Sequence, residues 1–177
     1  MGLRNFAFCV MDKKEDGSEE VLHWELIDLQ SLPGISVKSP FSQSSVVAYM
    51  AMLDSFQAWW ERSDIILIER QVRLNPKAQR LSYHCLSYFL FRYGLTKTIE
   101  EYSAKKKTHV FSESYEAFLR GRKNTKPLRK KWAMQEIKAW CQSTQSLEVQ
   151  QRWEELRKQD DVSDCVLMCR SYGIKNR

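Results

Sequence analysis

The sequence contains few residues that break regular structure and few that cross-link it. Only six of its 177 residues are glycine and four are proline, which leaves little room for long unstructured linkers. Its five cysteines form an odd set without a C-x-x-C pair, and its three histidines lie far apart, which argues against a zinc site and a disulfide scaffold. The sequence has no signal-peptide pattern and no apolar run near ~18 residues. We therefore expect an intracellular protein with reduced thiols and no membrane span.

The residues that are present are typical of one soluble globular domain. Hydrophobic residues make up 43% of the chain and charged residues 28%, and the six Trp, seven Tyr and eight Phe supply ample material for a core. The tryptophans expected in that core are Trp59, Trp60, Trp132, Trp140 and Trp153. We expect residues 1–177 to form a single domain.

Positive charge is concentrated in residues 103–131. This stretch holds ten basic residues and two acidic ones, so it carries a net charge of +8 within a chain of net charge +6. The basic residues are Lys105, Lys106, Lys107, Arg120, Arg122, Lys123, Lys126, Arg129, Lys130 and Lys131. Such a stripe indicates a ligand with a phosphate backbone, although a solvated lysine-rich face would have the same composition. Tyr115 and Phe118 lie inside the stretch and are candidates to stack on an exposed base.

Hydrophobic patterning predicts strands and one helix in the first part of the chain. Asn5 to Met11 and Val21 to Leu29 flank a polar turn and are expected to form a hairpin. Val46 to Trp60 has apolar residues at helical spacing. Asp64 to Arg70 contains a branched apolar run that ends on charged residues, which is the pattern of a buried central strand.

The remaining pattern completes an α/β fold. The expected elements are a helix over Ala78 to Tyr93 between Pro76 and Gly94, a strand over Thr108 to Ser112, and helices over Pro127 to Cys141, Leu147 to Lys158 and Asp160 to Tyr172. Because helices and strands alternate through much of the chain, we expect a mixed β-sheet.

Two carboxylates precede the apolar part of the final expected helix. Asp161 and Asp164 are three residues apart, so both project from one helix face. Two acids that lead into a buried helix require a cationic partner, and Mg²⁺ or Mn²⁺ accepts carboxylate oxygens as ligands. The alternative is an ordinary acidic helix N-terminus.

Another acidic position lies at the carboxyl end of the expected buried strand. Glu69 occupies this position, where ligands and phosphates collect in α/β sheets. Gln71, Arg73 and Asn75 alternate along the chain that follows and would present hydrogen-bonding groups on one side. The alternatives are a surface ion pair between Glu69 and a neighbouring arginine, and a simple turn at Asn75.

Four stretches occur in the order and spacing of one known family. They are Met1–Cys9 (MGLRNFAFC), Ile66–Gln71 (ILIERQ), Lys130–Ala133 (KKWA) and Lys158–Asp164 (KQDDVSD). Together they resemble the mitochondrial-type and poxvirus-type Holliday-junction resolvases, relatives of bacterial RuvC. The resemblance implies an RNase H-like fold, with a mixed β-sheet flanked by helices. It also implies a homodimeric endonuclease that uses divalent metal to cut symmetrically across a four-way DNA junction.

The resemblance further implies roles for individual residues. Glu69, Asp161 and Asp164 would be three of four carboxylates that bind Mg²⁺ or Mn²⁺. Lys130 or Lys131 would contact the scissile backbone or steady the charge of the developing phosphorane. The residues expected to hold DNA are Gln71, Arg73, Asn75, Lys105, Lys106, Lys107, Arg122 and Lys123. Dimerisation would use an apolar helix face around Leu81 to Phe89, unless that face belongs to the core.

One position of the family pattern falls outside the sequence. The first acidic residue would directly precede Met1, and Asp12 and Asp16 lie in the following turn, where they cannot replace it. This aspartate would bridge two metal ions, so we expect severely reduced cleavage and largely intact DNA binding from the chain as written. Two explanations are open: a sequence that starts at an internal methionine, which we favour, or a degenerate nuclease that only binds.

The leading hypothesis is therefore a Mg²⁺-dependent crossover-junction endodeoxyribonuclease that acts in DNA recombination and repair. The second hypothesis is a protein of the same fold that binds branched DNA by its shape and does not cut it. A third is an RNase H-like nuclease that acts on RNA–DNA hybrids or flaps. The expected place of action is a mitochondrion or a viral replication site.

Overall fold

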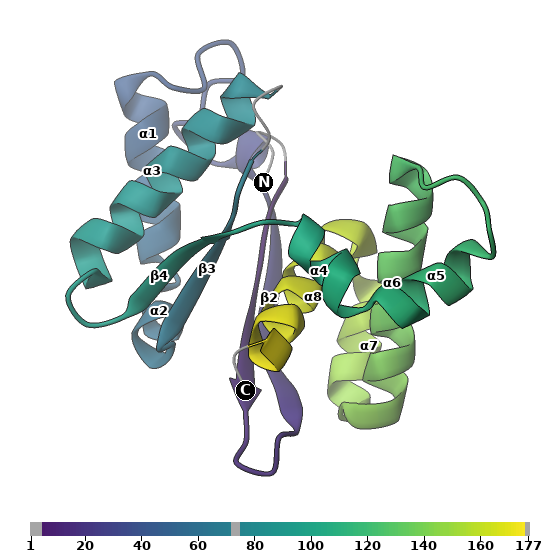
Figure 1. Cartoon of the computed structure of the whole chain (residues 1–177). Helices are drawn as coiled ribbons and strands as arrows, with labels where there is room; N and C mark the ends of the chain where they lie inside the picture. Colours follow the sequence, from purple (N-terminus) through teal and green to yellow (C-terminus); the bar gives the residue numbers. More distant parts are fainter. Residues whose placement is uncertain (1–4, 72–74, 176–177) are drawn as a thin grey trace. The chain divides into compact units, whose positions relative to one another are not determined.

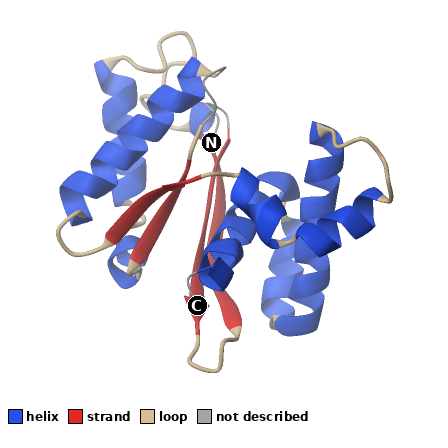
Figure 2. Ribbon diagram, in the orientation of Figure 1, coloured by secondary structure: helices blue, strands red, loops and turns tan. Residues whose placement is uncertain are grey.

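A computed structural model describes residues 5–71 and 75–175 of the chain. Within these ranges the chain forms four β-strands, eight α-helices and one 3-10 helix (Figures 1 and 2). They belong to two compact units, which we call unit 1 (residues 1–6 and 27–103) and unit 2 (residues 7–26 and 104–177). None of the helices in the described ranges is long and apolar enough to cross a membrane.

The first two strands, β1 (Asn5–Lys13) and β2 (Glu19–Asp28), pair with each other and form a hairpin. In its turn, the Lys14 N–H donates to the Ser18 carbonyl at 2.9 Å. Gly17 adopts a φ of +82°, a left-handed conformation that glycine takes without strain. Alternate side chains of β1 are buried, namely Phe6, Phe8 and Val10. The predicted hairpin is confirmed, and it is followed by the short 3-10 helix η1 (Leu29–Ser31).

Unit 1 contains a parallel strand pair and the helix that connects it: β3 (Ile65–Glu69), α3 (Pro76–Tyr93) and β4 (Thr98–Tyr102). Ile66 and Ile68 of β3 are buried, as the sequence predicts for a central strand. The register places Glu69 opposite Tyr102, so the carboxyl ends of both strands coincide.

Helix α3 begins where its capping residues place it. The Asn75 side chain accepts a hydrogen bond from the Ala78 N–H at 3.1 Å, and Pro76 follows at the first helical position. The buried face of α3 consists of Ala78, Leu81, Ser82, Cys85, Tyr88, Phe89 and Tyr93. The ring of Phe89 packs edge-on against Trp60 with centroids 5.3 Å apart. The apolar face around Leu81 to Phe89 is therefore core, which is one of the two roles that the sequence left open for it.

The predicted helix over Val46 to Trp60 is two helices, α1 (Gln43–Asp54) and α2 (Gln57–Arg62). Carbonyl groups in the last turn of a helix lack helical N–H partners. Two side chains after the break supply donors: the Ser55 hydroxyl donates to the Met52 carbonyl at 2.7 Å, and the Trp60 indole to the Leu53 carbonyl at 2.7 Å. The apolar residues keep their helical spacing across the break between α1 and α2, so the sequence pattern did not reveal that break.

The predicted strand over Thr108 to Ser112 is wrong. These residues belong to α4 (Lys105–Val110), a connecting residue and the start of α5 (Ser112–Leu119). Strand propensity depends strongly on context, and here α4 packs against the C-terminal helix of unit 2. The strand that pairs with β3 is instead β4, which the sequence pattern missed because Glu100 and Glu101 interrupt its apolar character.

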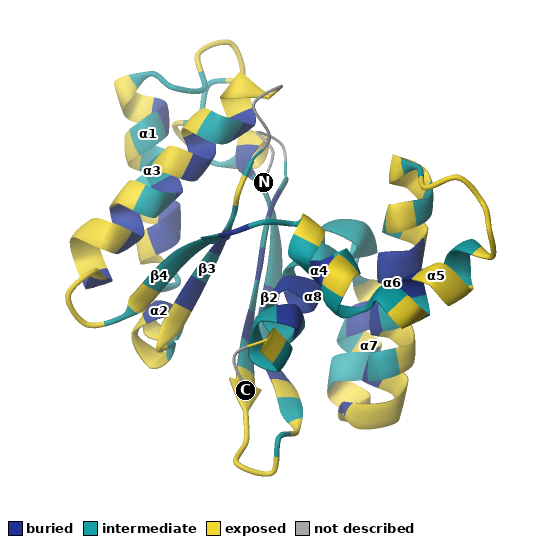
Figure 3. Cartoon of the chain, in the orientation of Figure 1, coloured by how far each residue is buried: buried dark blue, intermediate teal, exposed yellow. Residues whose placement is uncertain are grey.

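Unit 2 is built around three further helices: α6 (Lys126–Thr144), α7 (Leu147–Glu155) and α8 (Gln159–Lys175). All three were predicted, although α7 ends three residues before the expected Lys158. Val162, Val166 and Leu167 of α8 are completely buried and belong to one core cluster with Trp132 and Trp153. Of the five tryptophans expected in the core, Trp60, Trp132 and Trp153 are buried, whereas Trp59 and Trp140 are half-buried. Figure 3 shows the buried residues of α6 and α8 within this unit.

A polar contact joins α1 to α3 and provides a test of unit 1. Tyr88→Phe removes the hydroxyl that donates to Asp54 Oδ1 at 2.7 Å. We expect a loss of about 1 kcal/mol in the free energy of unfolding at neutral pH, a modest value because the Asp54 carboxylate is partly solvated. Urea unfolding measures it, and Tyr83→Phe on the exposed side of α3 is the matched control.

The effect of Tyr88→Phe should depend on pH. The hydrogen bond from Tyr88, together with that from Arg92, lowers the pKa of Asp54 below its usual 3.8. A lowered carboxyl pKa stabilises the folded state above the unfolded-state pKa, and this contribution is lost as the pH falls through the folded-state pKa. The difference between wild type and Tyr88→Phe should therefore narrow as the pH falls below 3.8. An unchanged difference would show that the ionised form of Asp54 is not the acceptor that matters.

Candidate active-site carboxylates and basic surface

The first two turns of α8 hold three aspartates, and each is paired with a lysine from a different segment. Asp164 accepts a hydrogen bond from Lys107 of α4, and Asp160 accepts one from Lys130 of α6. The third pair joins Asp161 Oδ2 to the Nζ of Lys158, which precedes α8, at 2.9 Å. All six residues belong to unit 2. The start of α8 is thus an acidic cluster in which each carboxylate is paired with a lysine ammonium group.

The electrostatics of the pair formed by Lys130 and Asp160 favour the ionised form of both groups. Burial opposes ionisation of Asp160, but the hydrogen bond from Lys130 and the positive charges of Lys130 and Lys158 outweigh it, so the pKa of Asp160 is lowered. The same hydrogen bond raises the pKa of Lys130. A helix N-terminus adds favourable partial positive charge. The aspartates therefore lie at a helix N-terminus, which was one of the two sequence interpretations. They also have cationic partners, which the other interpretation required, but these partners are lysines.

The donor chemistry of these residues suits a hard divalent cation, because carboxylate oxygens are the ligands that Mg²⁺ and Mn²⁺ prefer. Within the part of the chain that the structure describes, no three His, Cys, Asp or Glu side chains are grouped so that they would hold a metal ion. Lysine ammonium groups balance the charge of the α8 carboxylates instead. A metal at Asp161 and Asp164 would compete with the ammonium groups of Lys158 and Lys107 for these carboxylates.

Glu69 lies at the end of β3 in unit 1, the position that the sequence predicts. The amide of Gln71 donates to Glu69 Oε2 at 2.8 Å and to the Glu69 carbonyl at 3.2 Å. Gln71 therefore orients this carboxylate, which is a role that sequence reasoning did not assign to it. The side chain of Asn75 serves as the N-cap of α3. Arg73 lies outside the described residues.

The basic stretch divides into internal and external members. Lys107 is buried, with a side chain that is 10% exposed, and Lys130 is half-buried. Arg122 folds back on α5, where it donates to the Phe118 carbonyl at 2.6 Å and the Leu119 carbonyl at 3.0 Å. The exposed members are Lys105, Arg120, Arg122, Lys123, Lys126, Arg129 and Lys131, whereas Lys106 is half-buried. The solvated charge that a phosphate backbone would meet therefore lies mainly in the first turn of α4 and in residues 120–131.

The aromatic residues of the stretch pack into unit 2. The Tyr115 ring lies 4.9 Å from Trp132, centroid to centroid, and its hydroxyl donates to Asn124 Oδ1 at 2.7 Å. Tyr115 is buried, so its predicted role in base stacking is wrong. Phe118 is half-buried beneath the guanidinium of Arg122, whose carbon lies 5.2 Å from the ring centroid.

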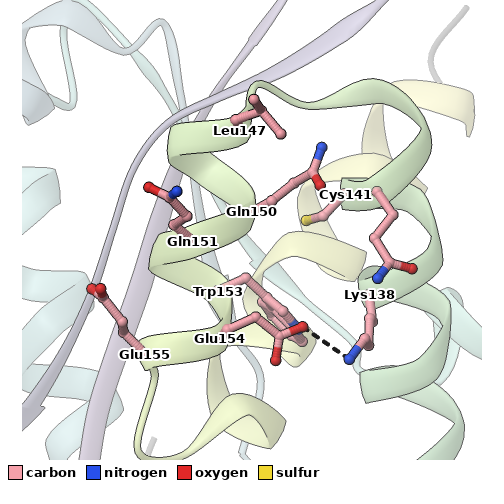
Figure 4. Close-up of a pocket in the computed structure, with 9 residues that line it drawn as sticks. Lys138, Cys141, Leu147, Gln150, Gln151, Trp153, Glu154 and Glu155 are labelled. Carbon is pink, nitrogen blue, oxygen red and sulfur yellow. Dashed lines mark ion pairs between the residues drawn. The ribbon is translucent and has the colours of Figure 1, made fainter.

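A cavity of about 350 Å³ lies between α6 and α7 (Figure 4). Cys141 of α6 and Leu147 and Trp153 of α7 form part of its wall. An ion pair of 2.8 Å between Lys138 Nζ and Glu154 Oε1 joins the two helices beside it. None of the residues predicted to bind metal or DNA lines this cavity, so it is separate from the expected chemistry.

A solved structure with a similar fold is that of the yeast mitochondrial Holliday junction resolvase Ydc2. The TM-score is 0.64 and the sequence identity 18%, and the match covers 98% of this chain and 76% of the Ydc2 chain. The chain therefore has the α/β fold of a mitochondrial-type resolvase. This confirms the predicted fold class and the predicted family resemblance at the level of the fold.

Two viral proteins are related in sequence. The uncharacterized protein 97L of Invertebrate iridescent virus 3 is 29% identical over 120 residues, which are 68% of this chain and 53% of the viral protein. The uncharacterized protein 170L of Invertebrate iridescent virus 6 is 25% identical over 146 residues, which are 75% of this chain and 59% of the viral protein. The chain thus spans little more than half the length of either relative. No protein-family model matches the chain.

The buried pair between Lys107 and Asp164 should contribute to stability. Lys107→Met leaves the partly buried Asp164 carboxylate without this counter-ion, and we expect a loss of about 2 kcal/mol in the free energy of unfolding. Lys105→Met, on the exposed side of α4, should change stability little.

A double-mutant cycle separates the pair from general packing. Adding Asp164→Asn to Lys107→Met should recover part of the lost stability, because the uncompensated charge is then removed. Urea unfolding of the four proteins measures the coupling. Additive effects of the two substitutions would contradict a direct interaction between these side chains.

Proposed function

We propose that the chain is a structure-specific DNA endonuclease that resolves four-way junctions by two-metal hydrolysis of phosphodiester bonds. The observation that carries this proposal is the likeness to the fold of the yeast mitochondrial Holliday junction resolvase, which extends over 98% of the chain. The sequence motifs add support, because they fall on the end of β3 and the starts of α6 and α8. The proposed cofactor is Mg²⁺ or Mn²⁺.

The proposed metal ligands are Glu69, Asp161 and Asp164. When bound, a divalent cation would supply Lewis-acid activation of water and of the phosphate. Gln71 would keep the Glu69 carboxylate oriented through the 2.8 Å hydrogen bond to Oε2. Lys158 and Lys107 now pair with the two aspartates, and they would yield these positions to the metal.

Lys131 is the stronger candidate of the two adjacent lysines to contact the scissile backbone. Its side chain is exposed, whereas Lys130 is half-buried and paired with Asp160. Lys130 would instead hold the start of α8 in place. The negative charge that develops on a phosphorane is best stabilised by a cation that has no competing carboxylate.

DNA binding is proposed to rest on the exposed basic residues and on backbone contacts rather than on base recognition. Lys105 and Lys123 are exposed members of this group, and Lys106, Arg122, Arg73, Gln71 and Asn75 are proposed to add further contacts. Lys107 would join them only after it leaves Asp164. A homodimer and the organisation of residues 1–177 as a single domain remain predictions from the resemblance and the composition. The viral relatives support a place of action at a viral replication site, and the likeness to the yeast mitochondrial resolvase supports a mitochondrion as the alternative.

Charge removal in the basic stretch should weaken junction binding. For the double variant Lys105→Gln/Lys123→Gln, we expect roughly tenfold weaker binding of a labelled four-way junction at ~0.1 M salt. The slope of log affinity against log salt concentration should become less steep by about 2. Lys38→Gln removes an exposed lysine outside the stretch and is the control. Equal effects of the double variant and the control would argue against a localised DNA-binding surface.

Cleavage should require the proposed carboxylates. The assay compares the chain, and the chain with Ile-Asp added before Met1, on a labelled four-way junction with Mg²⁺. We expect paired symmetric nicks from the extended chain, and a loss of more than ~100-fold on Asp161→Asn, Asp164→Asn or Glu69→Gln. Junction binding should persist in all of these variants. Glu148→Gln is the control. Glu148 is an acidic residue in the first turn of α7, and Asp161 has the equivalent position in the first turn of α8.

The second candidate function is binding of branched DNA without cutting. The lysine pairs on Asp160, Asp161 and Asp164 favour it, because they already neutralise the acids that a metal would need. Tight, salt-sensitive junction binding without nicks from the extended chain would establish this function and overturn the catalytic proposal. Equal nicking of an RNA–DNA hybrid would instead indicate a nuclease of broader specificity.

A further inference from the structure

Three thiols that the proposed nuclease does not use gather where β1 meets α8 in unit 2. The sulfur atoms of Cys9 and Cys169 are 3.6 Å apart, although the two residues are separated by 160 positions in sequence. Cys165, one helical turn before Cys169, donates a hydrogen bond to the Ala7 carbonyl of β1 at 3.3 Å. The three thiols thus line the contact between the strand and the helix.

The surroundings of Cys9 make it the less reactive of the two closest thiols. The hydrogen bond with Cys169, together with burial, raises the pKa of Cys9 well above its ordinary value. Cys9 therefore keeps its proton at neutral pH. Both thiols are partly exposed. Because Cys9 holds its proton, Cys169 is the member of the pair that reacts first with a small oxidant in solution. The other two cysteines, Cys85 and Cys141, are buried and lie outside the cluster.

We propose that Cys9 and Cys169 form a reversible disulfide when the protein meets a hydroperoxide, so that β1 becomes covalently joined to α8. The Cys169 thiolate attacks the peroxide oxygen, which gives a sulfenic acid and, from hydrogen peroxide, one water molecule after proton uptake. The Cys9 sulfur then attacks the Cys169 sulfur, and the Cys9 proton leaves with the hydroxide as a second water molecule. Two thiols are oxidised by two electrons in total, and one hydrogen peroxide is reduced.

The geometry favours this pair over the other combinations. Cys165 and Cys169 are successive members of one helix face, so their side chains run parallel and do not point at each other. The sulfur of Cys165 is turned to the Ala7 carbonyl. A disulfide between Cys9 and Cys169 would require the two sulfur atoms to approach by about 1.5 Å from their present separation. The resulting cross-link would hold the helix that carries Asp161 and Asp164 against the strand, whatever the function of those acids.

Peptide mapping of the full chain tests the proposal. The protein is treated with hydrogen peroxide, alkylated and digested with trypsin without reductant. We expect residues 5–13 to be linked to residues 159–170, and the link to disappear on treatment with dithiothreitol. Because the second peptide contains both Cys165 and Cys169, variants must identify the partner. The link should persist in Cys165→Ser and be absent from Cys9→Ser and Cys169→Ser.

Thermal unfolding provides an independent measurement. The oxidised wild type should unfold about 5–10 °C above the reduced form, because the cross-link restricts the unfolded chain. Cys165→Ser should keep this shift, and Cys169→Ser should lose it while its reduced form unfolds near the reduced wild type. A link that needs Cys165, a link between two chains, or sulfinic acid at Cys169 without any link would each overturn the proposal.

Discussion

The structure of unit 2 depends on placing an acidic sequence at the start of a helix that has to be buried. Helix α8 inserts Val162, Val166 and Leu167 into the core with no exposed surface, and it reaches that core directly after Asp160 and Asp161. Carboxylates at the edge of a core are costly unless cations compensate them. Three lysines provide this compensation from α4, from α6 and from the residues just before α8, so the same ion pairs also fix the helices that surround it.

This constraint gives the basic stretch two separate tasks. Lys107 and Lys130 turn inward to the acids, whereas Lys105, Lys123 and Lys131 remain at the surface. The charge that composition assigns to one ligand surface is therefore shared between internal neutralisation and an external patch. A divalent cation at Asp161 and Asp164 would compete with lysines, and it would transfer positive charge from the interior to the surface. Metal affinity and affinity for a polyanion would then be linked through the same side chains.

The elements that local rules determine were predictable from the sequence, and the contacts between distant residues were not. Asn75 and Pro76 mark the start of α3, and the branched residues of β3 mark a buried strand, because capping and burial act on neighbouring positions. The segment around Thr108 has strand-forming residues but becomes a helix end, since Lys107 is held by an aspartate 57 positions away. The sequence correctly placed Glu69 at a strand end. It could not predict the hydrogen bond from Gln71, because that contact depends on the backbone conformation after the strand, which residue propensities do not determine.

The contact of β1 with α8 also bears on the order in which the protein is made and folds. Cys9 and Cys169 meet across 160 positions, so unit 2 is assembled from two segments that leave the ribosome far apart in time. The β1–β2 hairpin is synthesised before α8, and an isolated two-stranded hairpin is only marginally stable in water. Val21 and Trp24 of the hairpin belong to the same core cluster as Val162, Val166 and Leu167 of α8, so they stay incompletely covered until that helix is made. During that interval the nascent chain exposes apolar side chains, so chaperone binding is most valuable at this stage.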